Sequence, residues 1–142
     1  MTNAFLRHIF AVMAKILLIE DDETQAQVYL TRLLGEGYST TWTKDGEQGL
    51  KMALENQPSL ILLDIKMPKM DGLSVMAELR KDGWGKKVPI ILLTNLEPND
   101  EILNHIEKDS PSYFLLKPST DLEEIIEKIN ETLANPPETV NT

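Results

Sequence analysis

The stretch SLILLDIKMPKMDG, residues 59–72, decides the fold. Its apolar residues 60–63 form an uninterrupted run, which is typical of a strand buried on both faces of a parallel sheet. The acid Asp64 ends that run, and a proline and an Asp-Gly pair follow it. Because these later residues are typical of a loop, the sequence places a carboxylate where a buried strand ends.

The whole chain alternates between two kinds of segment. Apolar or β-branched runs predict strands at 15–20, 39–43, 60–64, 88–94 and 112–116. Amphipathic runs predict helices at 22–37, 45–58, 72–83, 99–109 and 119–135. In the first helix, the stripe expected to face the core comprises Ala26, Tyr29, Leu30, Leu33 and Leu34. Such alternation implies parallel strands, right-handed crossovers and helices on both faces, so we predict an α/β fold with a three-layer, doubly wound parallel sheet.

The composition is that of one ordinary globular domain. The chain has 142 residues, of which 42% are hydrophobic, enough for a single core. The formal net charge of -9 argues against binding to nucleic acid or to anionic membranes. The chain has no cysteine, which excludes disulfides and thiolate chemistry and fits the cytoplasm. No apolar run reaches the length of a membrane span.

The predicted domain, residues 15–135, leaves short segments at both ends. Residues 136–142 form a polar tail and residues 1–14 an N-terminal extension. Arg7 and His8 interrupt the extension, so it lacks the unbroken apolar core of a signal peptide. A short amphipathic helix is left open there, because helical spacing relates the apolar residues Phe5, Leu6, Ile9, Phe10 and Met13.

Polar residues follow four of the predicted strands directly. They are Glu20, Asp21 and Asp22 after the first strand, then Asp64, Thr94, and Lys117 with Pro118. The carboxyl ends of parallel strands meet at one edge of the sheet, where open α/β sheets bind their ligands. We therefore expect these side chains to form one site.

The chemistry of such a site depends on its carboxylates. Clustered acids without cysteine or histidine suit a hard cation, and Mg²⁺ is bound by one or two carboxylates together with water and phosphate oxygens. With Mg²⁺ bound, Asp64 can stay ionised and act as a nucleophile on phosphorus. Lys117 and Thr94 could then contact the phosphoryl oxygens. Taken singly, each residue also fits an ordinary loop, cap or surface role, but the combination favours phosphoryl chemistry.

Four stretches, in order, carry a resemblance to a known family. ILLIEDD, LILLDIKMPKMDG, IILLT and FLLKP closely resemble the receiver domain of bacterial two-component response regulators, over about residues 15–134. The resemblance implies a flavodoxin-like (βα)5 fold with strand order 2-1-3-4-5, an order that is known from this family. It also implies a signalling protein that catalyses only its own phosphorylation and dephosphorylation, rather than an enzyme.

The resemblance gives most polar residues of the predicted edge a role, and it adds Lys66 and Phe114. Asp64 corresponds to the phosphorylated aspartate and Thr94 to the switch hydroxyl. Lys117 corresponds to the lysine of the site, whose bond to Pro118 would be cis, and Phe114 to the switch aromatic. The implied Mg²⁺ ligands are Glu20, Asp21, Asp64 and the backbone carbonyl of Lys66.

The chain departs from the family pattern near this edge. Asn95 follows Thr94 where a small residue is common, and it could slow or retune the chemistry. The switch aromatic is a phenylalanine, without a hydroxyl for a partner to read, and EKDSPSYF (107–114) lacks the common Gly-Ala-Asp-Asp-Tyr pattern. Leu96 stands at a position that tunes the lifetime of the phosphate in this family. Because an apolar side chain orients water poorly, we predict slow self-dephosphorylation.

The resemblance also implies partners. The phosphoryl donor would be a histidine kinase or a histidine phosphotransfer protein, and a downstream protein would bind the face formed by residues 99–109, 112–116 and 119–135. A homodimer is left open. Because only a polar tail follows the domain, we expect a stand-alone receiver with no direct contact to nucleic acid and no membrane insertion.

Three other functions compete with this interpretation. A pseudo-receiver would bind partners without phosphorylation, and Asn95 favours it. A metal-dependent phosphohydrolase of one large family would need a second acid where Lys66 stands. A flavin-binding module would need a phosphate-cradling loop where the acidic IEDDETQ (19–25) lies.

Overall fold

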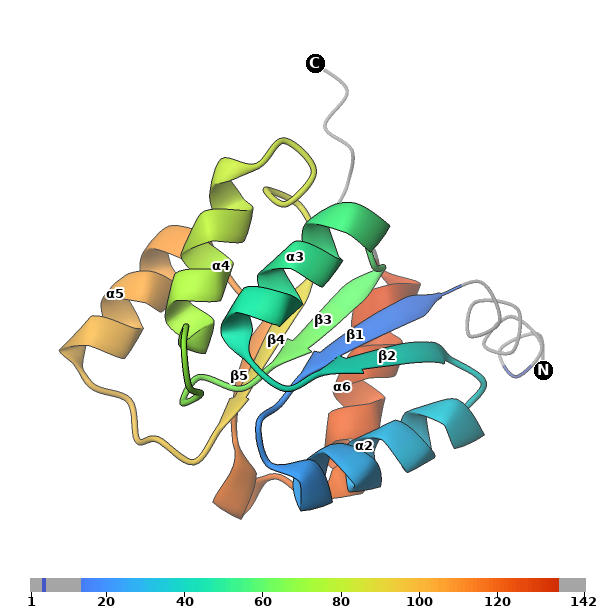
Figure 1. Cartoon of the computed structure of the whole chain (residues 1–142). Coiled ribbons are helices and arrows are strands. Elements are labelled where there is room, and N and C mark those ends of the chain that lie inside the picture. The colour runs from blue at the N-terminus through green and yellow to red at the C-terminus, as the bar shows by residue number, and fades with distance from the viewer. Residues whose placement is uncertain (1–3, 5–13, 136–142) are drawn as a thin grey trace.

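The structure is a computed structural model, and it describes residue 4 and residues 14–135 (Figure 1). The residues of the predicted amphipathic helix, Phe5, Leu6, Ile9, Phe10 and Met13, lie outside the described residues, as does the tail 136–142. Ala14 is buried, and its carbonyl accepts a hydrogen bond from the Ser39 N–H. It therefore packs with the domain.

The described residues alternate strand and helix along the chain. The strands are β1 (Lys15–Ile19), β2 (Ser39–Thr43), β3 (Leu60–Leu63), β4 (Ile90–Thr94) and β5 (Tyr113–Leu116). The helices are α2 (Glu23–Gly35), α3 (Gly46–Asn56), α4 (Gly72–Lys81), α5 (Asp100–Asp109) and α6 (Leu122–Ala134), with a 3-10 turn, η1 (Lys117–Ser119), after β5. All five predicted strands and helices are present, with ends that differ by a few residues.

The strands form one parallel sheet in the order β2-β1-β3-β4-β5, which confirms the predicted fold. The order in which strands are added to the sheet reverses at β1: β2 lies on one side of β1, and β3 lies on the other side. The pairings of Ile19 with Thr43 and with Leu63 bring the carboxyl ends of these three strands level. Polar residues after β1 and β3 are thereby neighbours at one edge.

Two cores lie on opposite faces of the sheet, because successive strand residues point to opposite sides. Ile16 and Leu18 pack in a core with residues of α2 and α6, whereas Leu17 and Ile19 pack in a second core with residues of α3, α4 and α5. Figure 1 shows the same division, with α2 and α6 on one face of the sheet and α3, α4 and α5 on the other. Two-sided burial explains why β1, β3 and β4 are continuous apolar runs.

Each helix begins at a side chain that accepts a hydrogen bond from the N–H three residues on. These N-caps are Asp22, Asp45, Asp71, Asn99 and Asp121. The last helix starts at Leu122 rather than at residue 119, because η1 occupies residues 117–119 and Asp121 is the cap.

Two detailed predictions are wrong. The expected cis bond before Pro118 is trans, because the described chain has no cis peptide bond. Leu34, expected in the core-facing stripe of α2, is 53% exposed. Only part of that stripe packs against the sheet: Ala26 and Leu33 are fully buried in the core, whereas Leu34 lies at the edge of the stripe and faces solvent.

Among the described residues, no helix is both long and apolar enough to cross a membrane.

Candidate functional site

Three carboxylates meet at the carboxyl edge of the sheet. Glu20 and Asp21 directly follow β1, and Asp64 directly follows β3. One oxygen from each lies within 4.8 Å of an oxygen of the other two. Glu20 and Asp64 are buried, with 2% and 8% of their surface exposed, whereas Asp21 is exposed. The cluster therefore opens to solvent on the side of Asp21.

Lys117 neutralises part of this negative charge. The Lys117 ammonium group, at the end of β5, donates to Glu20 Oε1 at 2.7 Å and to Asp64 Oδ2 at 3.3 Å. It thus bridges two carboxylates that come from different strands. Three carboxylates around one ammonium group leave the site with an excess of negative charge.

Burial and the neighbouring charges together set the ionisation of the site. Burial raises the pKa of Glu20, and the charge of Asp64 adds to that rise while the hydrogen bond from Lys117 opposes it. Burial and the neighbouring Glu20 raise the pKa of Asp21. Burial alone would lower the pKa of Lys117, but its hydrogen bond to Glu20 and the charge of Asp64 outweigh that, so its pKa is raised. The site is thus an acidic cluster that would gain from a bound cation.

The loop after β3 explains why an Asp-Gly pair follows Asp64 in the sequence. The N–H of Gly72 donates to the Ile65 carbonyl at 2.7 Å, which folds the start of α4 back onto the end of β3. A Cβ atom at Gly72 would lie 2.1 Å from the carbonyl oxygen of Asp64, closer than real Cβ contacts allow. Asp64 is further held by its N–H, which donates to the Ile19 carbonyl at 3.0 Å. Close packing of two backbones thus fixes the position of Asp64.

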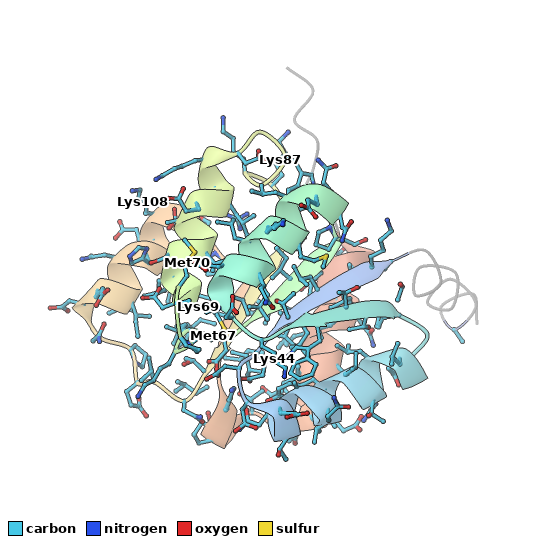
Figure 2. The ribbon with its side chains drawn as sticks, viewed as in Figure 1. Lys44, Met67, Lys69, Met70, Lys87 and Lys108 are labelled. Atoms are coloured by element: carbon cyan, nitrogen blue, oxygen red, sulfur yellow. The ribbon has the colours of Figure 1, made fainter. Side chains whose placement is uncertain are left out.

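The same loop contacts the start of α3. Figure 2 shows Met67, Lys69 and Met70 along this loop, and a Cβ atom at Gly46 of α3 would lie 2.0 Å from the Met70 carbonyl oxygen. Lys69 has a positive φ of 70°, and its ammonium group lies 3.6 Å from the Asp45 carboxylate. The loop is therefore attached to two neighbouring helices.

A cavity of about 170 Å³ lies over the carboxylates. Besides Glu20, Asp21 and Asp64, the residues that line it are Asp22, Gln25, Lys66, Thr94, Asn95, Leu96 and Lys117. The structure thus brings the sequence-predicted residues Lys66, Thr94 and Lys117 around the acids. The Thr94 hydroxyl oxygen accepts a hydrogen bond from the Leu96 N–H at 3.2 Å.

Phe114 lies outside the residues that line the cavity. It is partly buried on β5 and packs against the core that contains α3, α4 and α5. It pairs with Leu92 of the neighbouring strand, two residues before Thr94. Any influence of Phe114 on the carboxylates would therefore act through β4 and β5.

Two site residues were not predicted from the sequence. The Trp42 indole N–H donates to the Glu20 carbonyl at 2.8 Å, so β2 holds the backbone of the acidic pair. Gln25 lines the cavity from the first turn of α2. Nothing in the sequence around Trp42 indicates that its indole would bond to the backbone of the acidic pair. The spacing of Asp22 and Gln25, by contrast, is that of a helix capping box and could have drawn attention to Gln25.

Comparison with known proteins identifies the family. The model of the response regulator receiver domain matches residues 16–130. The chain belongs to the response regulator receiver domain family. Receiver domains are signalling modules of two-component systems, and the family interacts with histidine kinases or phosphotransfer proteins and with downstream effectors.

Curated relatives resemble this receiver domain over part of their own length. The response regulator PleD of Caulobacter vibrioides is 34% identical over 109 residues, which is 77% of this chain and 24% of PleD. The DNA-binding dual master transcriptional regulator RpaA of Synechocystis is 32% identical over 121 residues, 85% of this chain and 49% of RpaA. The chain thus spans about a quarter to a half of these relatives.

Solved receiver domains share the fold. The receiver domain of a sensor histidine kinase from Pseudomonas aeruginosa is 28% identical, with a TM-score of 0.76 over 85% of this chain and 98% of that one. That structure holds a magnesium ion coordinated in its active-site cleft. The Francisella response regulator 1452 receiver domain is also 28% identical, with a TM-score of 0.76 over 85% of this chain and 97% of that one. Phosphorylation and Mg²⁺ binding at an acidic pocket are general in the family.

Proposed function

We propose that this receiver domain accepts a phosphoryl group on Asp64, with Mg²⁺ held by Glu20, Asp21, Asp64 and the backbone carbonyl of Lys66. One observation carries the proposal: three carboxylates have oxygens within 4.8 Å of one another, and Lys117 bonds to two of them. This arrangement would destabilise an ordinary loop through like-charge repulsion, and it suits a site that binds a cation and a phosphoryl group.

The residues present fit Mg²⁺ by their chemistry. The donor set consists of oxygen atoms, which Mg²⁺ prefers. Burial, together with the neighbouring carboxylates, raises the pKa values of Glu20 and Asp21, so a cation beside them would favour their ionised forms. When bound, Mg²⁺ neutralises charge on the carboxylates and on the phosphoryl oxygens. The cavity of about 170 Å³ leaves space for an ion that keeps some of its waters.

The chemical step would transfer a phosphoryl group from an imidazole nitrogen of the donor's histidine to a carboxylate oxygen of Asp64. A carboxylate oxygen of Asp64 attacks the phosphorus of a phosphohistidine, the P–N bond breaks, and its electron pair stays on the imidazole nitrogen. Lys117 then contacts a phosphoryl oxygen as a point charge. The Thr94 hydroxyl gives up its contact with the Leu96 N–H and donates to another phosphoryl oxygen. The donor is a histidine kinase or a histidine phosphotransfer protein.

Movement of Thr94 would carry the signal to a protein-binding surface. Phe114 lies on the strand next to Thr94 and fills the space that Thr94 leaves, and the surface of α5, β5 and α6 then changes its affinity for a downstream protein. We place this receiver at residues 15–135, between an extension and a tail, and in the cytoplasm. A homodimer through the same surface is one form that this output could take.

The pseudo-receiver is the second candidate. It rests on Asn95, whose exposed side chain lines the cavity beside Thr94, where it could crowd a phosphoryl group. The other residues that the transfer would use, Glu20, Asp21, Asp64, Thr94 and Lys117, line the same cavity, which supports phosphorylation over this alternative. A phosphohydrolase with a separate substrate is less well supported, because Lys66 lines the cavity where that chemistry needs a second acid.

The intact mass of the full chain tests this proposal. The protein is incubated with acetyl phosphate and Mg²⁺, beside a sample with chelator and the variant Asp64→Ala. We expect one phosphoryl adduct in the wild type and none in either control. If a folded wild-type protein gains no adduct, the pseudo-receiver becomes the better account, and Asn95→Ala should then restore phosphorylation.

A further inference from the structure

Gln25 carries a buried acceptor that the proposed chemistry does not use. Its side-chain oxygen, Oε1, is buried and has no hydrogen-bond partner in the structure. Gln25 lines the same cavity as the three carboxylates and Lys117. Buried polar atoms are normally hydrogen-bonded, and leaving one unsatisfied reduces stability. The position of this atom therefore calls for a physical reason.

The hydrogen bonds at the start of α2 explain why Oε1 is left over. Asp22 is the N-cap, and Gln25 stands three residues on, where a glutamine side chain usually accepts from the N–H of the cap residue. Here the Asp22 N–H donates to Glu20 Oε2 at 3.1 Å instead. The Asp22 carboxylate already accepts from the Gln25 N–H at 2.9 Å. The helix start is thus capped without the Gln25 side chain.

The cavity wall contains donors on Lys66, Thr94, Asn95 and Lys117, but none of them bonds to Oε1 in the structure. Ionised carboxylates only accept hydrogen bonds, and the ammonium group of Lys117 is bonded to Glu20 and Asp64. A cation in the cavity would bring donors with it, because Mg²⁺ dehydrates reluctantly and keeps several waters. Water bound to a divalent cation donates strongly, and an amide oxygen can accept from it without adding negative charge to the site.

We propose that Gln25 is a positioning residue of the metal site, whose amide oxygen accepts a hydrogen bond from a water ligand of Mg²⁺. The proposal rests on the proposed function, since it needs Mg²⁺ at the carboxylates. It assigns to α2 a direct part in metal binding, in addition to the acids that follow β1 and β3. Gln25 would therefore tune the affinity for Mg²⁺ without touching the ion.

Calorimetric titration of the full chain with Mg²⁺ tests the proposal. Gln25→Met keeps the length of the side chain but removes the acceptor, and Gln25→Glu keeps an acceptor. Gln27→Met is the matched control, because Gln27 is exposed on the same helix and lies outside the residues that line the cavity. We expect Gln25→Met to raise the Kd for Mg²⁺ roughly fivefold, the value of one ordinary hydrogen bond, and the other two variants to bind at least as tightly as the wild type.

Thermal unfolding without Mg²⁺ separates this role from capping. If Oε1 is unsatisfied in the metal-free protein, Gln25→Met should unfold at the same temperature as the wild type or higher. An unchanged Kd with a lower unfolding temperature would overturn the proposal, because Gln25 would then be a capping residue. Equal weakening by Gln25→Met and Gln25→Glu would also overturn it. A wild-type protein that binds no Mg²⁺ would instead refute the proposed function itself.

Discussion

At the scale of single residues, Lys117 is the cation that contacts the buried carboxylates Glu20 and Asp64. Its ammonium group lies 2.7 Å from Glu20 and 3.3 Å from Asp64, so it compensates part of the charge of both. The side chain of Lys117 is itself only 8% exposed. Removing it would leave two buried carboxylates and the nearby Asp21 without their cation.

We expect Lys117→Met to destabilise the protein by about 3 kcal/mol at neutral pH, since it breaks a buried ion pair from one side. The pKa of Glu20 is already raised, and it would rise further without the hydrogen bond from Lys117. A carboxyl group whose pKa is higher in the folded than in the unfolded state binds extra proton when folded, so stability falls as the pH rises through that window. The loss should therefore shrink as the pH is lowered toward the ordinary range of a carboxyl group.

Urea unfolding at several pH values measures this difference. Lys108→Met, on the exposed surface of α5, is the control for loss of one positive charge. A destabilisation by Lys117→Met that stays constant between neutral and mildly acidic pH would contradict the linkage to Glu20.

A second prediction at this scale concerns Leu96 and the lifetime of a phosphoryl group on Asp64. Leu96 lines the cavity and is partly buried, so under the proposed function it would present an apolar side chain to water that approaches a phosphoryl group on Asp64. Leu96→Asn should accelerate loss of the phosphoryl group about tenfold, because an amide can orient the attacking water. The rate is measured by intact mass after removal of the donor, and an unchanged or lower rate would count against the idea.

The sequence predicts where the site residues lie in the fold better than it predicts which atoms they contact. Each of Asp64, Thr94 and Lys117 ends or follows an apolar run, so a parallel sheet must bring them to one edge. The bond between the Trp42 indole and the Glu20 carbonyl could not be foreseen, because it depends on how a side chain of the edge strand turns. The spacing of Asp22 and Gln25 draws attention to Gln25, but it does not reveal that Glu20 takes the Asp22 N–H, the usual partner of the Gln25 side chain.

At the scale of elements, the fold follows from hydrophobic period and caps. Uninterrupted runs predicted β3 and β4 because burial on both faces leaves no polar position. Element ends were harder to predict, because they depend on local competition: both Ser119 and Asp121 can cap a helix, and η1 leaves Asp121 as the cap of α6. The wrong prediction for Leu34 has a similar origin, since the pattern does not say how much of an apolar stripe the sheet covers.

The prediction at the scale of elements concerns Gly72, where the start of α4 packs against the end of β3. Gly72→Ala would push the new Cβ atom into the Asp64 carbonyl, because the gap is 2.1 Å. We expect a loss of roughly 3 kcal/mol in the free energy of unfolding, at the upper end for overpacking, together with slower phosphorylation.

Gly35→Ala is the matched control for that variant. Nothing lies within 4 Å of a Cβ atom at Gly35, the last residue of α2. Replacing a helical glycine with alanine there should stabilise the protein by up to about 1 kcal/mol. Both values come from urea unfolding, and a Gly72→Ala protein as stable as Gly35→Ala would show that the two backbones are less tightly packed than described.

At the scale of the whole molecule, the acidic cluster adds to a net charge of -9. Mg²⁺ that binds the folded state alone stabilises it by mass action, by about 2.7 kcal/mol when free Mg²⁺ is a hundredfold above its Kd. For a domain of this size, that should raise the unfolding temperature by roughly 10 °C.

Asp21→Asn should abolish most of this rise. Without Mg²⁺ at neutral pH, the same variant should be slightly more stable than the wild type, by less than about 1 kcal/mol for so exposed a group. The sign follows from the raised pKa of Asp21, whose ionised form is disfavoured by burial and by Glu20. Glu55→Gln, on the exposed face of α3, changes the net charge equally and should keep the full response to Mg²⁺.

The central claim is that Asp64 itself receives the phosphoryl group, and chemical trapping tests it most directly. After incubation with acetyl phosphate and Mg²⁺, borohydride reduces an aspartyl phosphate to homoserine, which peptide mass spectrometry can place in the sequence. We predict homoserine at position 64 alone, and none when Mg²⁺ is chelated. Homoserine at position 21 or elsewhere, or an adduct that resists reduction, would contradict the account.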